Sequence, residues 1–334
     1  MKVFVTGGTG FVGSHLVQAL LERGDDVVCL ARNPTKVDRL FTGKKPRVVL
    51  GDLENREAML QGVRGADVVF HVAGLIAARS GAEFFAANAA GTRLLAEATT
   101  HVAPLLKRFV YVSSLAAAGP SRRGTPLTET DVAKPITLYG SSKRAGEEAL
   151  STFDFPWTAI RPPVVYGPRD TEMFRVFKLG ALGLGAVFGD GTQELSFIYV
   201  EDLVSALLHA ADRAGPRSTY FAAHPEVVTT RELVTRVHRA VRGLSNSTGS
   251  EKAEPFVLPI PGALARGGLW LTEKAAALTG KATLLTRDKA NEFLAEAFVC
   301  SPAALTRDTG WQPQWDLAKG LPRTAAWYRS EGWL

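Results

Sequence analysis

The sequence predicts an α/β protein with a doubly wound parallel sheet and a smaller C-terminal lobe. Short apolar strands alternate with helical patterns over residues 1–165, and this alternation is typical of strands that pair in parallel. A glycine-rich turn directly follows the first strand. The alternation weakens from residue 166, so we expect residues 166–195 and 215–334 to form the smaller lobe. Residues 196–214 are expected to return to the main domain.

Three glycines join the first strand to the first helix. The β-branched run at 3–6 predicts a buried strand, and a helical pattern follows the turn. Such a turn lets the backbone approach an anion at the positive end of a helix. Gly7, Gly10 and Gly13 are spaced three residues apart, which differs from the usual G-x-G-x-x-G dinucleotide fingerprint. A loop that requires positive φ would also explain these glycines. The position between strand and helix favours a dinucleotide site, which we expect to be formed by Gly7, Thr9, Gly10, Phe11, Val12 and Gly13.

The second strand, predicted at 27–30, is followed by Arg32 where dinucleotide folds that bind NAD usually carry an acid. A carboxylate there would repel a 2′-phosphate, whereas a guanidinium can pair with it for about 1.5–3 kcal/mol. Arg32 therefore favours NADP as the cofactor. NAD stays the alternative, because a solvated arginine in a loop would give the same sequence.

The next two strands also end in residues that suit a ligand. Asp52 and Leu53 follow the third strand, and the Asp52 carboxylate can face an adenine amino group, cap the next helix, or do both. A strand predicted at 66–74 ends in Ala73 and Gly74, whose small size would let the backbone come close to a cofactor.

The fifth strand, predicted at 109–112, stops at Ser113 and Ser114. Polar side chains at the carboxyl end of a parallel strand lie where ligands bind in this architecture. The helix predicted at 138–150 then carries Tyr139 and Lys143, four residues apart and so on one face. An ammonium near a phenol stabilises the phenolate, so the two side chains form a plausible acid–base pair. An ordinary amphipathic helix surface could carry the same pair.

Two stretches of the C-terminal half are less regular. The polar residues 243–254 predict a loop. The stretch 256–271 is apolar but is interrupted by prolines, glycines and Arg266. Either a hydrophobic cap over a substrate or a buried helix would explain it, and we favour the buried helix.

The composition of the 334 residues is that of an ordinary globular enzyme, with 46% hydrophobic and 22% charged residues. The net charge of +6 is scattered along the chain and does not predict nucleic-acid binding. The histidines have no metal-ligand spacing, so we expect no metal. We find neither a signal peptide nor an apolar run long enough to span a membrane, and therefore expect a cytoplasmic location.

The motifs together resemble the extended short-chain dehydrogenase/reductase family, also called the NAD-dependent epimerase/dehydratase family. The resemblance rests on the glycine turn, on the Ser113–Ser114 strand end, on the Tyr139–Lys143 pair and on a similar C-terminal ending around 309–313 and 320–321. It implies a Rossmann-type domain with a C-terminal substrate lobe. It also implies Tyr139 as general acid/base, Lys143 on the nicotinamide ribose and Ser114 rather than Ser113 on the substrate oxygen.

The resemblance further implies which residues contact the cofactor. Besides the glycine turn, Tyr139 and Lys143, these are Arg32, Asp52, Leu53, Ala73, Gly74, Asn88, Arg161, Pro162 and Val164. Members of the family often pair through two helices, including the one that bears the tyrosine, which implies a homodimer.

Three departures from the epimerase pattern indicate which branch of the family the sequence resembles. Leu195 stands where sugar-nucleotide epimerases tend to carry an arginine, Pro163 replaces an amide, and the small apolar run 115–118 lacks hydroxyls that contact a sugar. The pattern is closer to dihydroflavonol-reductase-like and 3β-hydroxysteroid-dehydrogenase-like members. We therefore expect an NADP-dependent oxidoreductase that acts on a secondary alcohol or ketone of a fairly apolar small molecule. An NAD-dependent nucleotide-sugar epimerase or dehydratase, and a non-catalytic cofactor sensor, are the alternatives.

Overall fold

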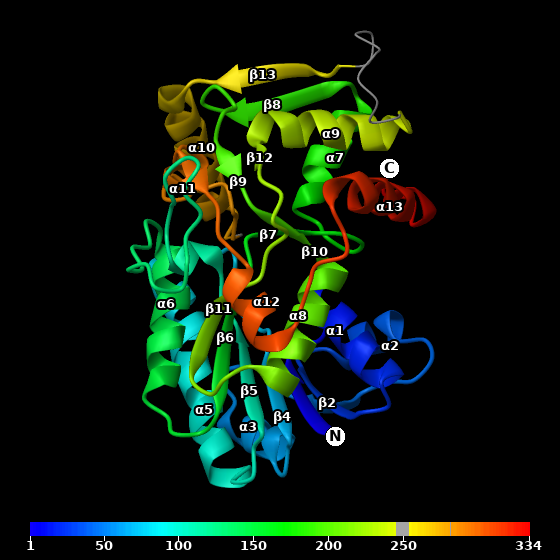
Figure 1. The fold of residues 1–334 in the computed structure, drawn as a ribbon, viewed down its shortest axis with the longest axis vertical. Helices are drawn as coiled ribbons and strands as arrows, with labels where there is room; N and C mark the ends of the chain where they lie inside the picture. Colours follow the sequence, from blue (N-terminus) through cyan, green and yellow to red (C-terminus); the bar gives the residue numbers. More distant parts are fainter. Residues whose placement is uncertain (245–253, 281) are drawn as a thin grey trace.

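The computed structural model describes residues 1–244, 254–280 and 282–334. Its centre is a seven-stranded sheet with the order β11-β6-β5-β4-β1-β2-β3, in which every neighbouring pair is parallel (Figure 1). The strands are β1 (Lys2–Thr6), β2 (Asp26–Ala31), β3 (Arg47–Leu50), β4 (Val68–His71), β5 (Arg108–Val112), β6 (Trp157–Arg161) and β11 (Ser218–Phe221). The order reverses beside β1, as in doubly wound dinucleotide-binding sheets.

Helices cover both faces of this sheet, because its strands are apolar on both sides. Val3 and Val5 point toward one group of helices and Phe4 toward the other, as the two-residue repeat of a strand requires. The first group is α1 (Phe11–Glu22), α2 (Pro34–Leu40), α8 (Val200–Arg213) and α12 (Ala303–Thr309). The second group is α3 (Arg56–Val63), α5 (Gly91–Val102) and α6 (Leu138–Ser151). The predicted parallel α/β sheet is confirmed.

A second hydrophobic core lies beyond the carboxyl ends of the strands. It joins apolar side chains from three helices and a two-stranded sheet, and these include the aromatic residues Tyr166, Phe177 and Tyr328. Its elements are β7 (Val164–Tyr166), α7 (Met173–Ala181), β10 (Phe197–Tyr199), α9 (Thr230–Arg242) and α13 (Leu317–Ser330). Smaller elements border this core: β8 (Leu184–Phe188), β9 (Glu194–Leu195), β12 (Val228–Thr229), β13 (Phe256–Ile260), α10 (Gly262–Leu278), α11 (Ala290–Phe293) and β14 (Ala297–Phe298).

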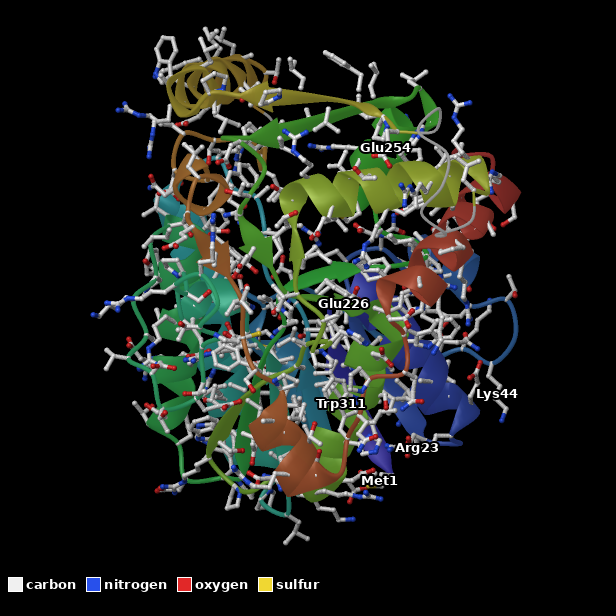
Figure 2. All side chains as sticks on the ribbon, turned by 45° about the horizontal axis from the view of Figure 1, so that its top comes forward. Met1, Arg23, Lys44, Glu226, Glu254 and Trp311 are labelled. Atoms are coloured by element: carbon white, nitrogen blue, oxygen red, sulfur yellow. The ribbon has the colours of Figure 1, made fainter. Side chains whose placement is uncertain are left out.

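The expected membership of the C-terminal lobe requires a correction. Residues 218–221, expected in that lobe, form β11 and pair with β6 at the edge of the main sheet. Leu305 of α12 and the buried Trp311, labelled in Figure 2, also belong to the core of the main domain. These apolar side chains cover the end of the sheet beside α8, which would otherwise be exposed to water.

The expectation of a buried helix at 256–271 is wrong. These residues form β13 and most of α10, and Phe256, Leu264 and Leu271 are exposed. Most of the polar stretch 243–254 lies outside the described residues. Within the described ranges, no helix is both long and apolar enough to cross a membrane.

Two further short helices complete the first half of the chain. Asn88 lies in a π-helical turn, η1 (Ala86–Ala90), between α4 (Gly81–Phe85) and α5. After β5, Ser114 begins a 3-10 turn, η2 (Leu115–Ala117), by accepting the backbone N–H of Ala116 at 3.1 Å. Both turns lie beside α6 and therefore next to Tyr139 and Lys143.

Candidate active site

A cleft of about 1180 Å³ runs along the carboxyl ends of the sheet strands and continues under the second core. Sixteen of the predicted site residues line this cleft, although they are spread along the first 165 residues of the chain. They are Gly7, Thr9, Gly10, Phe11, Val12, Gly13, Arg32, Asp52, Leu53, Ala73, Gly74, Ser114, Tyr139, Lys143, Pro162 and Val164. A cleft at the strand order reversal is where ligands bind in doubly wound sheets.

The glycine turn has the geometry that close backbone approach requires. Gly7 has φ of +72°, and a Cβ there would lie 2.5 Å from the backbone nitrogen of Ala73. A Cβ on Gly13 would lie 2.1 Å from the carbonyl oxygen of Gly7. Gly10 begins α1 without a side-chain cap, so the first N–H groups of the helix can face an anion. The residues of the turn fit the diphosphate of a dinucleotide.

Two cations line the cleft at the end of β2. Arg32 and Lys36 both border the cavity, and in the described part of the chain neither forms an ion pair. Asn33 fixes the start of α2 between them by accepting the Thr35 N–H at 2.9 Å. Lys36 was not expected from the sequence; it lies in the first turn of α2, whereas Arg32 precedes that helix. The pair presents two positive charges to the cleft at the end of β2.

The Asp52 carboxylate does not cap the next helix. It accepts the backbone N–H of Glu54 at 3.0 Å, whereas Asn55 caps α3 through the N–H of Ala58. Of the two interpretations of Asp52, helix capping is therefore excluded. The carboxylate lies on the wall of the cleft.

Ser113 and Ser114 differ in what their hydroxyls do. Ser113 is buried and donates to the Glu147 carboxylate at 2.6 Å. Glu147 is itself buried and accepts two hydrogen bonds from the Arg161 guanidinium, at 2.8 and 2.6 Å. The Ser114 hydroxyl accepts the Ala116 N–H instead, and it acts to lower the pKa of Tyr139. Both serines line the cleft, but the Ser113 hydroxyl is already bonded to Glu147, so the geometry favours Ser114 as the serine available to a ligand.

Tyr139 and Lys143 lie on the face of α6 that borders the cleft. Burial raises the pKa of Tyr139 to about 12, against the opposing effect of the Ser114 hydroxyl. Burial lowers the pKa of Lys143 to about 7, and the charge of Glu147 opposes that change. The Lys143 ammonium donates to the Val112 carbonyl at 2.6 Å. At neutral pH the phenol is therefore protonated and can act as an acid.

Two residues predicted to contact a cofactor lie behind the wall of the cleft. The Asn88 amide is buried, accepts the Leu75 N–H at 2.8 Å and donates to the Ser142 hydroxyl at 2.9 Å. Arg161 is buried in its ion pair with Glu147. Neither lines the cavity, because their polar atoms are already bonded to α6 and its neighbours. Glu147 was missed, although its spacing of four from Lys143 was visible in the sequence.

The far part of the cleft is largely apolar. Its walls come from α7, β8, β9, α9, α11 with the segment before it, and β14. They include Met173, Val176, Leu179, Val187, Phe188, Leu195, Leu233, Leu284, Leu285, Phe293 and Phe298. The ion pair of Arg175 with Glu172 lines this part of the cleft at α7. A second ion pair, Lys289 with Glu292, interrupts the apolar surface next to Tyr139. The Lys289 ammonium lies 5.2 Å from the centre of the Tyr139 ring. Neither residue of this pair was expected from the sequence.

Comparison with known proteins identifies the family. The model of the NAD-dependent epimerase/dehydratase family matches residues 3–222. The chain belongs to this family. It is 33% identical to a ceramide reductase from Caulobacter vibrioides, over 99% of this chain and 96% of that protein.

Other members of the family are similar over most of their length. A 4-hydroxy-2-methyl-3-oxo-4-farnesyl-3,4-dihydroquinoline-1-oxide ketoreductase from Stigmatella aurantiaca is 30% identical, over 89% of this chain and 92% of that protein. Among solved structures, the UDP-glucose 4-epimerase from Thermotoga maritima, determined with UDP-glucose, has a TM-score of 0.78 at 23% identity and covers 99% of each chain. The last likeness shows the fold, which is that of extended short-chain dehydrogenases. The family binds NAD(P), and this chain is an NAD(P)-dependent oxidoreductase.

Proposed function

We propose that the protein is an NADP-dependent reductase of a ketone, or a dehydrogenase of the matching secondary alcohol, on a largely apolar molecule. The observation that carries this proposal is that Ser114, Tyr139 and Lys143 border one cleft whose far part is apolar. Two of the relatives described above are named for reduction of compounds with long hydrocarbon groups, a ceramide and a farnesyl quinoline. Those names support an apolar substrate for this chain.

Residues that depart from the epimerase pattern lie on the wall of the cleft. Leu195, Pro163, Leu115 and Ala116 all border the cleft. Hydrocarbon at these positions cannot pair with the diphosphate or hydroxyls of a sugar nucleotide, and burying those polar groups unpaired would be costly. The same surface would gain about 25 cal/mol for each Å² of apolar substrate that it buries.

The residues have complementary roles in the proposed reduction. The bound nicotinamide would supply a hydride to the carbonyl carbon. Ser114 would donate a hydrogen bond to the carbonyl oxygen and hold it beside Tyr139. As the carbon–oxygen double bond becomes a single bond, Tyr139 would transfer its proton to that oxygen, leaving a phenolate. The Lys143 ammonium would stabilise the phenolate until it regains a proton from solvent.

The cofactor is proposed as NADP because Arg32 and Lys36 border the cleft at the end of β2. A 2′-phosphate could pair with both, whereas the ribose hydroxyls of NAD could not use their charges fully. The glycine turn, Asp52, Leu53, Ala73 and Gly74 would surround the rest of the dinucleotide. We propose that Asn88 and Arg161 act behind this wall, by fixing Ser142 and Glu147.

Replacement Tyr139→Phe tests the proposal. We expect turnover of aliphatic ketones of graded chain length to fall about 10²–10⁴-fold, because a general acid contributes that much. NADPH affinity, followed by cofactor fluorescence, should stay within a factor of three of the parent value, on the order of 0.7 kcal/mol. The control is Tyr220→Phe, whose hydroxyl binds Asp308 outside the cleft. Unchanged turnover in Tyr139→Phe would refute the assignment. Tight NADPH binding without reduction of any ketone would favour a cofactor sensor.

A further inference from the structure

The end of the C-terminal lobe exposes an unusual row of leucines. Leu264, Leu271 and Leu278 of α10 are 67%, 61% and 90% exposed. They are spaced by seven residues, which places them along one side of the helix. Ordinary surface helices direct their apolar side inward, whereas this helix carries a row of leucines on its outer side as well. Figure 2 shows side chains of α10 projecting into solvent at the top of the molecule.

Contacts on its opposite side hold α10 against the lobe. Ala265 and Leu269 are buried there. The Thr272 hydroxyl donates to the Leu285 carbonyl at 2.6 Å, and the Glu273 carboxylate accepts the Arg287 N–H at 2.9 Å. The leucines are therefore exposed even though α10 is packed against the lobe. The segment held by these contacts also borders the apolar part of the cleft through Leu284 and Leu285.

The neighbouring strands extend the same surface. β13 pairs in parallel with β8, and alternate side chains of this ribbon point outward, with Phe256 at 68%, Leu258 at 51% and Leu184 at 42% exposure. Figure 1 places β13, β8 and α10 together at the end of the molecule remote from the N-terminus. We call the leucine row and the outward side chains of this ribbon the α10–β13 face.

The charges on this face are mainly positive. Lys274 is exposed on α10, and its ammonium lies 5.9 Å from the centre of the exposed Trp270 ring. Arg266 is also exposed; it borders the face on the side toward α11, where its guanidinium donates to the Asn291 side chain at 3.1 Å. The one acid of α10, Glu273, is directed to the Arg287 backbone. At the other end of the ribbon, Glu254 is paired with Arg239.

We propose that the α10–β13 face binds the surface of an anionic lipid bilayer. Leucines and a tryptophan flanked by Lys and Arg are the pattern of helices that lie in the bilayer interface, with the apolar row among the acyl chains and the cations at the headgroups. A twofold contact between copies would oppose like charges on the same face, which is unfavourable. The inference goes beyond the proposed function, because it concerns an attachment that needs neither cofactor nor ketone.

Flotation with lipid vesicles tests the proposal. The full chain should bind vesicles of phosphatidylcholine with 30% phosphatidylglycerol, and the double variant Leu264→Gln, Leu271→Gln should lose at least about tenfold in affinity, since burial of a leucine is worth a factor of ten or more. The double variant Leu105→Gln, Val132→Gln is the matched control, because both residues are exposed, at 87% and 78%, on loops of the main domain. It should bind as the parent does.

A second pair of variants tests the charges. Arg266→Gln with Lys274→Gln should weaken binding to the anionic vesicles by about fivefold for each charge, and leave binding to pure phosphatidylcholine unchanged. Lys44→Gln with Lys45→Gln is the control. The variant Tyr139→Phe should still bind vesicles. Membrane binding can therefore be tested even if the protein does not reduce ketones. The proposal is overturned if the parent does not float, if the leucine variant floats equally well, or if that variant instead turns a dimer into a monomer.

Discussion

At the scale of single residues, the cleft separates groups that touch a ligand from groups that support them. Ser114, Tyr139 and Lys143 border the cavity, whereas Glu147 and Arg161 form a buried ion pair behind it. Ser113 also borders the cavity, but its hydroxyl is bonded to Glu147. Adjacent serines on one strand end point to opposite sides, so one hydroxyl stays available and its neighbour is committed to a carboxylate. The burial of Tyr139 and Lys143 changes both pKa values away from those of free side chains.

The first residue-scale prediction concerns cofactor choice. Replacing Arg32 and Lys36 together by Ala should raise the KM for NADPH at least tenfold and leave the KM for NADH within threefold, because each charge-assisted hydrogen bond contributes about 1.5–3 kcal/mol. Initial-rate kinetics with both cofactors measures the effect. Arg39→Ala, on the same helix, is the control. An equal loss with both cofactors would contradict the assignment of these cations to a 2′-phosphate.

The second residue-scale prediction concerns pH. Because burial lowers the pKa of Lys143 to about 7, its ammonium is present below that pH and is lost above it. We expect kcat/KM for ketone reduction to fall as the pH rises through about 7, since less positive charge then stabilises the tyrosinate. Profiles of the parent and of Lys143→Met measure this. The variant should be slower and lack the inflection, and an identical inflection in both would assign it to another group.

At the scale of elements, α6 and β6 are joined by the Glu147–Arg161 ion pair in the interior. The two side chains are 3% and 5% exposed, so neither charge can be hydrated if the other is removed. The same carboxylate accepts a hydrogen bond from Ser113, the residue that follows β5. The strand ends and the helix that carries Tyr139 are thereby fixed relative to one another.

Glu147→Gln should therefore destabilise the fold by about 3–5 kcal/mol, the typical cost of leaving one member of a buried pair without its partner. Urea unfolding followed by circular dichroism gives the free energy of unfolding. Glu148→Gln is the neighbouring control: its carboxylate pairs with Arg144 and is 61% exposed, so we expect a loss below about 1 kcal/mol. Equal stability of both variants would show that the buried pair contributes little.

At the scale of the whole molecule, the cleft lies between the main sheet and the second core and takes walls from both. A ligand that fills it must stabilise the native state by mass action. NADP at about 100 times its dissociation constant should add about 2.7 kcal/mol of stability, visible as a rise of several degrees in Tm. Differential scanning fluorimetry compares NADP, NAD and UDP-glucose. A protein purified with tightly held NAD and stabilised by UDP-glucose would favour the epimerase or dehydratase alternative.

Local sequence signals were sufficient for most of the main domain. Periodicity located the strands to within a few residues, because each strand is buried on both faces and so has to be apolar throughout. The glycine turn was readable because a Cβ at Gly7 or Gly13 would overlap backbone atoms. The Tyr139–Lys143 spacing was readable because residues four apart on a helix share a face.

Only the tertiary structure decided what depends on distant contacts. It showed that β11 and Trp311 belong to the main domain. β11 pairs in parallel with β6, and Trp311 is buried in the same core as α8, although these residues are far apart in the chain. It exposed α10, whose apolar composition alone had suggested burial. It also brought Lys289 beside Tyr139. The sequence by itself determined the dinucleotide fold and its glycine turn, because these follow from local backbone sterics and periodicity. The surroundings of that turn follow from packing between segments that no local pattern relates.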